Sequence, residues 1–392
     1  MPLFYLVLLC LVLPARAQDP GMISAFQHFY NLEYDEAIAQ FERGVKEQPD
    51  NPERWNHLAL AIVFREMFRS GALESEMVTG NNAFLRRPKM NPSPEVQREF
   101  TGAIGKAMSL AQARLAKNPR DTGALYALGV SHGLRANFNW LVRKAWLDSL
   151  RDATTARKYH NKVTEIDPSF TDARLVQGTH DYIVGSLPLA YKLLGFLVGF
   201  RGDRDAGIRT LQLVAQKGRL NKVDAEVLLA AIYRREHRAK DALPLLADLI
   251  RRYPRNYLFR FEKSQMCSEI GDKTCALGEL AKIEELKNAN APGYHRVPLE
   301  KILSARGIVQ FWYGDLDDAI ANLRRVTAKA DEVDLNTGVY SWLRLAEALD
   351  LKGRRPEALS AYRQTINYAP QSDAAKEARR YVDSPFRRKT KL

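Results

Sequence analysis

Small and large residues recur along this chain at one helical spacing. An alanine is followed by packing positions four and seven residues later, and a proline stands twelve residues after the alanine. Positions i, i+4 and i+7 share one face of a helix, and proline ends that helix. Five segments keep the full pattern: Ala37-Phe41-Gly44-Pro49, Ala107-Ala111-Arg114-Pro119, Ala156-His160-Val163-Pro168, Ala242-Leu246-Leu249-Pro254 and Ala358-Tyr362-Thr365-Pro370. Two more, Ala276-Leu280-Ile283 and Ala319-Leu323-Val326, keep it without the proline.

A second helix is expected ahead of most of these segments. Each of four small residues stands twelve positions before the alanine of its own unit: Ala230, Ser264, Gly307 and Ala346. Short turns that contain glycine, such as those at Gly314 and Gly353, separate the two helices. The pattern therefore predicts an all-α chain of stacked helical hairpins.

The spacing resembles that of the tetratricopeptide repeat. Ala242 and Ala276 lie 34 residues apart, which is the period of this repeat class. The resemblance covers most of residues 22–382 and implies an α-α superhelix of helix-turn-helix repeats. It also implies a non-catalytic scaffold that holds a protein or peptide partner on its concave face.

Three insertions interrupt the predicted array, near residues 71–94, 137–150 and 186–200. The first is rich in Gly, Asn and Pro and is expected to be a long loop, and the second is an aromatic linker. Residues 383–392 form a basic tail, of which Arg387 to Leu392 are predicted to lack order.

A shorter segment, residues 178–218, resembles a second family. Its glycines, from Gly185 through Gly199 and Gly202 to Gly218, are similar to those of the eukaryotic tetratricopeptide family linked to inclusion-body clearance at the mitochondrial outer membrane. The resemblance covers about forty residues and includes no catalytic motif.

The first seventeen residues are typical of a secretory signal. Leu3 to Leu13 is apolar, and Ala15-Arg16-Ala17 offers small residues two apart, which predicts cleavage before Gln18. A short uncut anchor and lipidation at Cys10 are the alternatives. We expect an exported protein, periplasmic or secreted, in which Cys267 and Cys275 are either a disulfide or two buried thiols.

The charge balance favours an anionic partner. The formal net charge is +13, and removing Arg16 with the leader leaves +12. Export and the lack of a recognition motif argue against nucleic acid. We therefore expect a protein or peptide of acidic character.

The sequence offers no catalytic constellation, metal site or cofactor motif. Gly129-Val-Ser131-His-Gly133 matches G-x-S-x-G, which needs a sharp turn between a strand and a helix. Here the motif falls inside a predicted helix, where we interpret it as packing. The seven histidines never pair at i+3 or i+4, which leaves open only a metal site assembled from distant units.

Candidate binding residues follow from the position of each small packing residue on its first helix. The inner face is expected one place and four or five places beyond it. This rule selects Tyr126, Val130, Leu134, Arg234, Arg235, Phe261, Gln265, Ile308, Phe311 and Trp312, with Lys301 one turn earlier. Mixed aromatic and basic side chains suit an extended peptide that carries carboxylates. The alternative is that several of them pack against neighbouring helices.

The apolar run from Leu187 to Phe200 supports a second hypothesis. Its fourteen residues are too few to span a bilayer, but they could dip into one. An envelope protein that contacts lipid through this run and a basic surface is the alternative function, and burial in the array's own core is the other structural interpretation.

Overall fold

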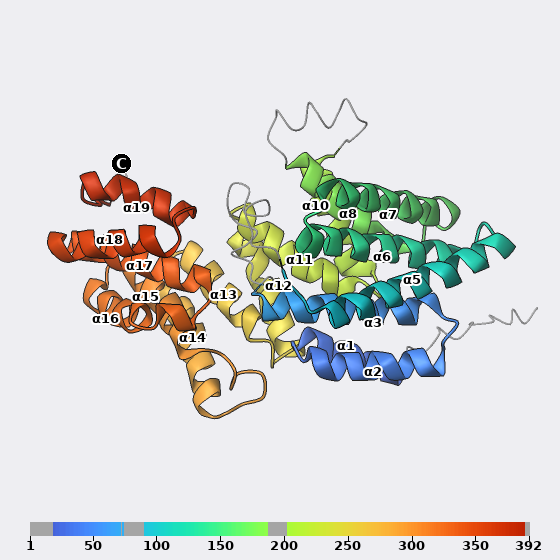
Figure 1. The fold of residues 1–392 in the computed structure, drawn as a ribbon, viewed down its shortest axis with the longest axis horizontal. Helices are drawn as coiled ribbons and strands as arrows, with labels where there is room; N and C mark the ends of the chain where they lie inside the picture. Colours follow the sequence, from blue (N-terminus) through green and yellow to red (C-terminus); the bar gives the residue numbers. More distant parts are fainter. Residues whose placement is uncertain (1–18, 72, 74–89, 187–201, 389–392) are drawn as a thin grey trace, which may run out of the picture.

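The structure is a computed structural model that describes residues 19–71, 73, 90–186 and 202–388 (Figure 1). Every regular element within these ranges is a helix, so the predicted all-α fold is confirmed. The predicted leader, the apolar run 187–200 and most of the first insertion lie outside the described residues.

The helices pair as antiparallel hairpins, each with a first and a second helix. The pairs are α1 (Pro20–Tyr30) with α2 (Tyr34–Glu47), α3 (Pro52–Arg69) with α5 (Pro94–Lys117), α6 (Thr122–Phe138) with α7 (Trp146–Ile166), α8 (Arg174–Gly185) with α10 (Arg204–Lys217), α11 (Lys222–Arg235) with α12 (Ala239–Arg252), α13 (Tyr257–Glu269) with α14 (Lys273–Asn288), α15 (Leu299–Tyr313) with α16 (Leu316–Thr327), and α17 (Leu335–Leu351) with α18 (Arg355–Tyr368). Helix α19 (Asp373–Asp383) ends the array.

The residues that predicted the repeat pack as expected. The alanine of each repeated segment is buried in a second helix: Ala37, Ala107, Ala156, Ala242, Ala276, Ala319 and Ala358. Gly271, Gly314 and Gly353 adopt positive φ values of 85°, 89° and 72° in the turns that follow first helices. Such φ values favour glycine, which explains these turns.

The second predicted insertion is mostly helical. Helix α6 runs into a π-helical turn over Asn139–Arg143, and α7 begins at Trp146. The chain reverses at Lys144, which has a positive φ of 54°. The aromatic linker is therefore part of the α6–α7 hairpin.

Helices α8 and α10 form a hairpin that the repeat spacing did not identify. They meet backbone to backbone, because a Cβ on Gly207 would lie only 2.5 Å from the backbone nitrogen of Tyr182. A Cβ on Gly185 would lie 2.3 Å from the nitrogen of Arg204. Glycine replaces alanine here as the small residue that lets the helices approach.

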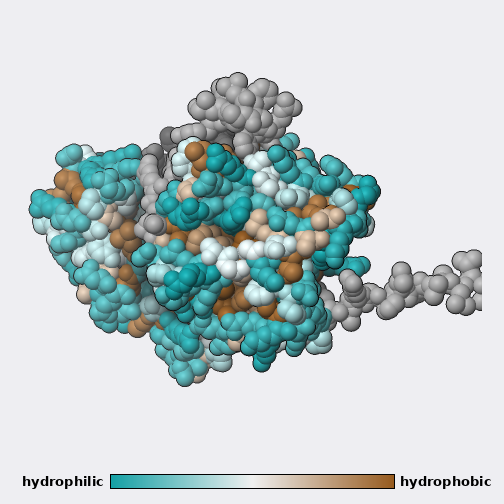
Figure 2. Space-filling view, turned by 45° about the vertical axis from the view of Figure 1, so that its right-hand side comes forward, coloured by the Kyte–Doolittle hydropathy of each residue, from teal (hydrophilic) through white to brown (hydrophobic). Residues whose placement is uncertain are grey.

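The first helices lie on the inside of the curve. In parts of the array, first helices contact one another directly: α3 touches α6, α15 touches α17, and α17 touches α19. On the face drawn in Figure 2 the surface is mainly hydrophilic, and apolar atoms show in narrow strips.

The first half of the array, α1 to α12, closes on itself. Figure 1 shows α1 beside α12 and the start of α13, although they are far apart in sequence. The Tyr30 hydroxyl donates to Asp224 at 2.9 Å, and the Asn256 amide donates to the Tyr30 carbonyl at 2.8 Å. Arg255 forms a two-pronged ion pair with Glu33, with N···O distances of 2.6 and 2.8 Å.

The second half, α13 to α19, has no such closure among its described residues. Its apolar side chains form two smaller clusters, one around Ile283 and Val297 and one around Leu343 and Tyr362. In the first half the main cluster spans Ala25 in α1 to Met266 in α13, and two small clusters lie around Leu128 and around Val163. The two halves therefore use the same repeat in different ways.

Candidate binding surface

The inner face of the second half is built by α13, α15, α17 and α19. Trp312 near the end of α15 is 54% exposed, and the guanidinium of Arg344 on α17 lies 5.1 Å from its ring centre. Arg344 also forms ion pairs with Glu347 at 2.5 Å and with Glu377 of α19 at 3.7 Å. A cation over an indole ring is attractive. Trp312 is therefore held in place and remains open to a partner.

Arg344 and Glu347 form a buried charged pair beneath this surface. Burial raises the pKa of Glu347 to about 7, although Arg344 opposes the shift. Glu347 is fully buried, and its Oε1 has no hydrogen-bond partner. The rule that selected inner-face positions by their distance from the small packing residue includes neither Arg344 nor Glu377, because neither residue lies at those positions. The only signal in the sequence was Arg344 followed three residues later by Glu347, a typical helical ion pair.

Three of the candidate binding residues are buried in the protein's own packing. Tyr126 lies between His160 and Phe170, with both ring centres 5.1 Å away, and its hydroxyl accepts a hydrogen bond from Asn221. Arg234 is buried and pairs with Glu262 at 2.8 Å.

The third, Phe311, is fully buried beneath the guanidinium groups of Arg344 and Arg388. Leu134, from the wider set, is buried as well. These four side chains do not line an open groove in this structure. They are buried in the protein's own packing, which is the alternative that the sequence left open.

The remaining candidates are accessible to different degrees. Arg235, Gln265 and Trp312 are exposed, whereas Val130, Phe261, Lys301 and Ile308 are partly buried. Phe261 packs edge-on against Tyr257 with ring centres 6.1 Å apart. Lys301 pairs with Asp334 at 3.6 Å. Gln265 and Phe261 on α13 and Ile308 and Trp312 on α15 thus remain at least partly accessible on successive first helices.

Arg235 lies apart from these residues. It lines a cavity of about 710 Å³ at the junction of α8, α10 and α11, together with Ser186, Asp203 and Arg204. Its guanidinium lies 5.8 Å from the ring centre of Tyr182. Adjacent arginines on one helix therefore diverge: Arg234 turns into the core, and Arg235 turns to the surface.

The cations of the inner face are largely matched by the chain's own carboxylates. Arg234, Lys301 and Arg344 each have an acidic partner within 4 Å. Pairs of this kind neutralise the charge that composition alone suggested would be offered to a ligand. The aromatic character of the surface around Trp312 is thus its stronger feature.

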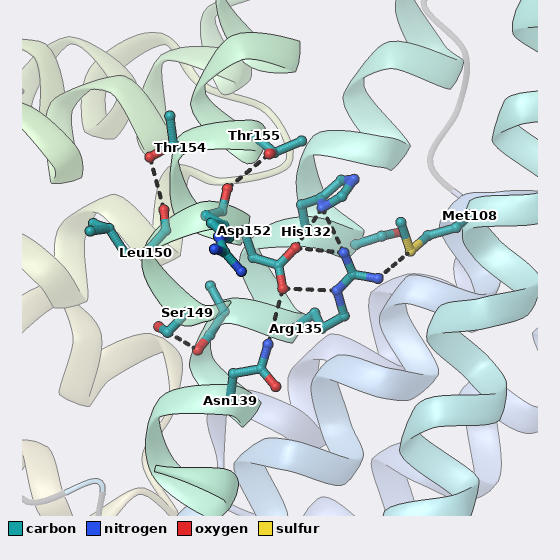
Figure 3. A network of polar contacts seen from close by, with 12 residues as sticks. Met108, His132, Arg135, Asn139, Ser149, Leu150, Asp152, Thr154 and Thr155 are labelled. Carbon is teal, nitrogen blue, oxygen red and sulfur yellow. Dashed lines mark hydrogen bonds and ion pairs between the residues drawn. The ribbon is translucent and has the colours of Figure 1, made fainter. Parts of the chain in front are cut away.

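The G-x-S-x-G segment lies in the middle of α6, and its polar side chains hold helices together (Figure 3). The Ser131 hydroxyl lies 2.7 Å from Asn56 Oδ1 and 2.9 Å from the Ala127 carbonyl. These contacts tie the serine to amide and backbone oxygens rather than to a base. No group of His, Cys, Asp and Glu within the described ranges is arranged to hold a metal ion.

His132 and Asp152 belong to a network that joins α6 to α7. His132 Nδ1 lies 2.8 Å from Asp152 Oδ1, Arg135 donates to both carboxylate oxygens at 2.6 and 2.8 Å, and Asn139 donates at 3.0 Å. Burial alone would raise the pKa of Asp152, but the hydrogen bonds from Arg135 and His132 hold it below its usual range. Each acceptor position is thus used to stabilise the hairpin.

Cys267 and Cys275 are joined by a disulfide, with Cα atoms 5.7 Å apart. Cys267 is buried near the end of α13, and Cys275 lies in the first turn of α14. The bond links the two helices of one hairpin across the turn at Gly271. It therefore fixes α13, which carries Phe261 and Gln265, to the helix behind it.

Comparison with known proteins relates the chain to others by structure alone. The sequence matches no protein-family model and no curated protein. The structure is similar to a chain in the crystal structure of the APC/C hetero-tetramer Cut9-Hcn1, with a TM-score of 0.51 and 12% identity over 93% of this chain. The match spans 56% of that longer chain. This likeness supports the fold.

Two further solved structures align more loosely. Yeast Tom70 aligns with a TM-score of 0.41 and 13% identity, covering 93% of this chain and 94% of that one. YrrB, a TPR protein with an unusual peptide-binding site, aligns with a TM-score of 0.31 and 15% identity, covering 69% and 97%.

Proposed function

This chain has the tetratricopeptide-repeat fold, and we propose that it is a non-catalytic scaffold of the cell envelope that holds a protein or peptide partner. The surface proposed to bind the partner is the inner face of the second half, around Phe261, Gln265, Ile308 and Trp312. The observation that carries the proposal is the exposed Trp312 ring, fixed by Arg344 from the next first helix.

The geometry supports this role in two ways. A large aromatic side chain that is already held in place loses little conformational freedom when a partner covers it. Tryptophan is also among the residues that contribute most to binding when a contact becomes buried. The acidic character of the partner is proposed from the net charge of the chain, +13, rather than from Arg344, which already pairs with Glu347 and Glu377.

Affinity capture from cell envelopes, followed by measurement with the purified partner, tests the proposal. Replacing Trp312 by alanine should weaken binding by about 2 kcal/mol, the loss expected of an interfacial tryptophan. Trp146→Ala is the matched control, because Trp146 is equally exposed but lies on α7 in the first half. Equal affinity of the Trp312→Ala variant and the wild type would refute the assignment of the surface.

A second function, contact with lipid, is favoured by one separate observation. Four large apolar side chains are exposed at the amino end of α7 and near the end of α8: Trp146, Leu147, Leu150 and Ile183. The ion pair between Arg157 and Asp181, at 2.7 Å, holds α7 beside α8. Among the described helices, none combines the length and apolar character needed to cross a bilayer. The proposed contact is therefore peripheral.

Flotation with anionic liposomes tests this second function. The Leu147→Ser and Ile183→Ser double variant should float less than the wild type. Leu220→Ser, which removes an exposed leucine elsewhere on the chain, should float as the wild type does. Equal flotation of all three proteins would refute a role for this patch.

A further inference from the structure

Residues 384–388 cross the carboxyl ends of two first helices without forming a helix of their own. The Phe386 backbone N–H donates to Asp350 Oδ2 near the end of α17 at 2.8 Å. The Arg388 guanidinium donates to the Phe311 carbonyl of α15, and its centre lies 5.5 Å from the Phe311 ring centre. The segment is thus attached to two successive units of the array. The sequence predicts that Arg388 lacks order. In the structure Arg388 is held in place, because its guanidinium contacts the carbonyl and the ring of Phe311.

Asp350 is a fixed acceptor for the main chain of this segment. Its carboxylate is fully buried and also accepts hydrogen bonds from Arg355 at 3.0 Å and from the Tyr362 hydroxyl at 3.0 Å. These contacts hold the carboxylate in one orientation whether or not the segment is bound. The Phe386 N–H completes its set of donors, and a carboxylate takes backbone N–H groups of any sequence.

Phe386 and Arg388 supply the side-chain part of the contact. The Phe386 ring lies 5.1 Å from that of Tyr381 and 5.9 Å from that of Phe311, measured between ring centres. Arg388 lies at the carboxyl end of α15, where the helix dipole favours a positive charge. Arg387, between them, is exposed and makes none of these contacts. Alternate residues of an extended strand point to the same side, which matches this pattern.

We propose that the carboxyl ends of α15, α17 and α19 form a peptide-binding seat, defined by Phe311, Asp350 and Tyr381, and that residues 384–388 are its ligand in cis. The partner that fits the seat is an extended segment with an aromatic residue two positions before an arginine. It binds in place of the chain's own segment. The seat adjoins the surface around Trp312, whose ring centre lies 5.1 Å from that of Phe311, but it takes a different ligand, so the proposal goes beyond the proposed function.

The exchange follows from how few contacts hold the segment. One backbone N–H, one ring and one guanidinium anchor it, and Ser384, Pro385 and Arg387 are exposed. The covalent link to α19 keeps the segment in the seat despite these few contacts, because a short linker gives an effective concentration in the millimolar range. A free peptide therefore competes poorly with the intact chain and well with a chain whose own segment has lost its anchors.

A labelled peptide with the sequence of residues 381–392 tests the proposal by fluorescence anisotropy. The full chain carrying Phe386→Ala and Arg388→Ala should bind it at least about tenfold more tightly than the wild type does, because the tethered competitor is removed. The Arg387→Ala chain is the matched control and should behave as the wild type does. A peptide with alanine in place of both anchors should not bind the vacated seat.

Three results would overturn the proposal: no binding to the double variant at millimolar peptide, equal binding to the double variant and the wild type, or binding that does not depend on the peptide's two anchors. A thermal melt of the double variant checks that the array remains folded. We expect this result because both substituted side chains lie outside the repeats. The probe is a peptide of the chain's own sequence, so the binding result does not depend on the partner of the proposed function.

Discussion

The two halves of the array use the inner face of the same repeat for different purposes. In the first half, inner side chains contact one another across the curve, as Tyr30 does with Asp224 and Tyr126 with Asn221. In the second half, Trp312 packs against Phe311 of its own helix and against Arg344 of the neighbouring unit, and it keeps an exposed ring. The repeat thus dictates where an inner face lies, and the residues on it decide whether that face binds a partner or the chain itself.

The polar chemistry of the closed half fits a structural role. Burial raises the pKa of Asp224 to about 6, and the hydrogen bond from Tyr30 only partly offsets it. Burial also lowers the pKa of His57 and of His160 to about 4, so both rings are neutral near pH 7. Burying a titratable group costs free energy. Such groups therefore stay buried only where the surrounding packing stabilises the structure.

Replacing aromatic residues should give the largest difference in stability loss between the two halves. Tyr30→Ala removes a buried ring and a closing hydrogen bond, and we expect it to lower the free energy of unfolding by about 4 kcal/mol. Trp312→Ala, in the open half, should cost about 1 kcal/mol, the value of a partly exposed cation–π contact. Urea unfolding followed by circular dichroism measures both. Equal losses would mean that the first half is not closed by these contacts.

The disulfide of the open half should have a smaller effect. It closes a loop with a sequence separation of 8 residues. A loop of that size constrains the unfolded chain by about 2 to 3 kcal/mol. The Cys267→Ser and Cys275→Ser double variant, compared with the wild type with and without reductant, measures the loss. A wild type that is insensitive to reductant, once thiol release is verified, would contradict the expected contribution.

Below pH 4.5 we expect the smallest effect from Glu347→Gln, because the protonated carboxyl of the wild type and the amide of the variant are both neutral. The folded-state pKa of Glu347 is raised from 4.5 to about 7. Its contribution is therefore fully present below pH 4.5 and is lost as the pH rises through about 7. The variant should thus gain stability relative to the wild type between pH 5 and pH 8. A stability difference that does not change with pH in thermal melts would show that Glu347 titrates normally.

Much of the fold, and less of the site, could be predicted from the sequence. The alanine spacing located the second helices because a residue such as Ala319 or Ala358 has to be small wherever a neighbouring helix approaches. The α8–α10 hairpin escaped the same rule, since Gly178 and Gly207 perform that task without an alanine.

The candidate site depends on curvature, which local spacing does not encode. Tyr126 and Trp312 occupy inner positions on their own helices, yet one is covered and the other is open. The difference arises from contacts more than ninety residues away in sequence, such as that of Tyr126 with Asn221. Export, cleavage before Gln18, the acidic character of the partner and the likeness of residues 178–218 to the mitochondrial outer-membrane family stay predictions.

Photo-crosslinking from the inner face tests the central claim most directly. A benzoylphenylalanine residue would replace Trp312, which is 54% exposed, and in a matched control Trp146, which is 59% exposed on the first half. A third position, Gln265 on α13, probes the same surface as Trp312. We predict that Trp312 and Gln265 give an adduct with the same protein partner and that Trp146 does not. An adduct at Trp146 with none at Trp312 or Gln265 would contradict the account.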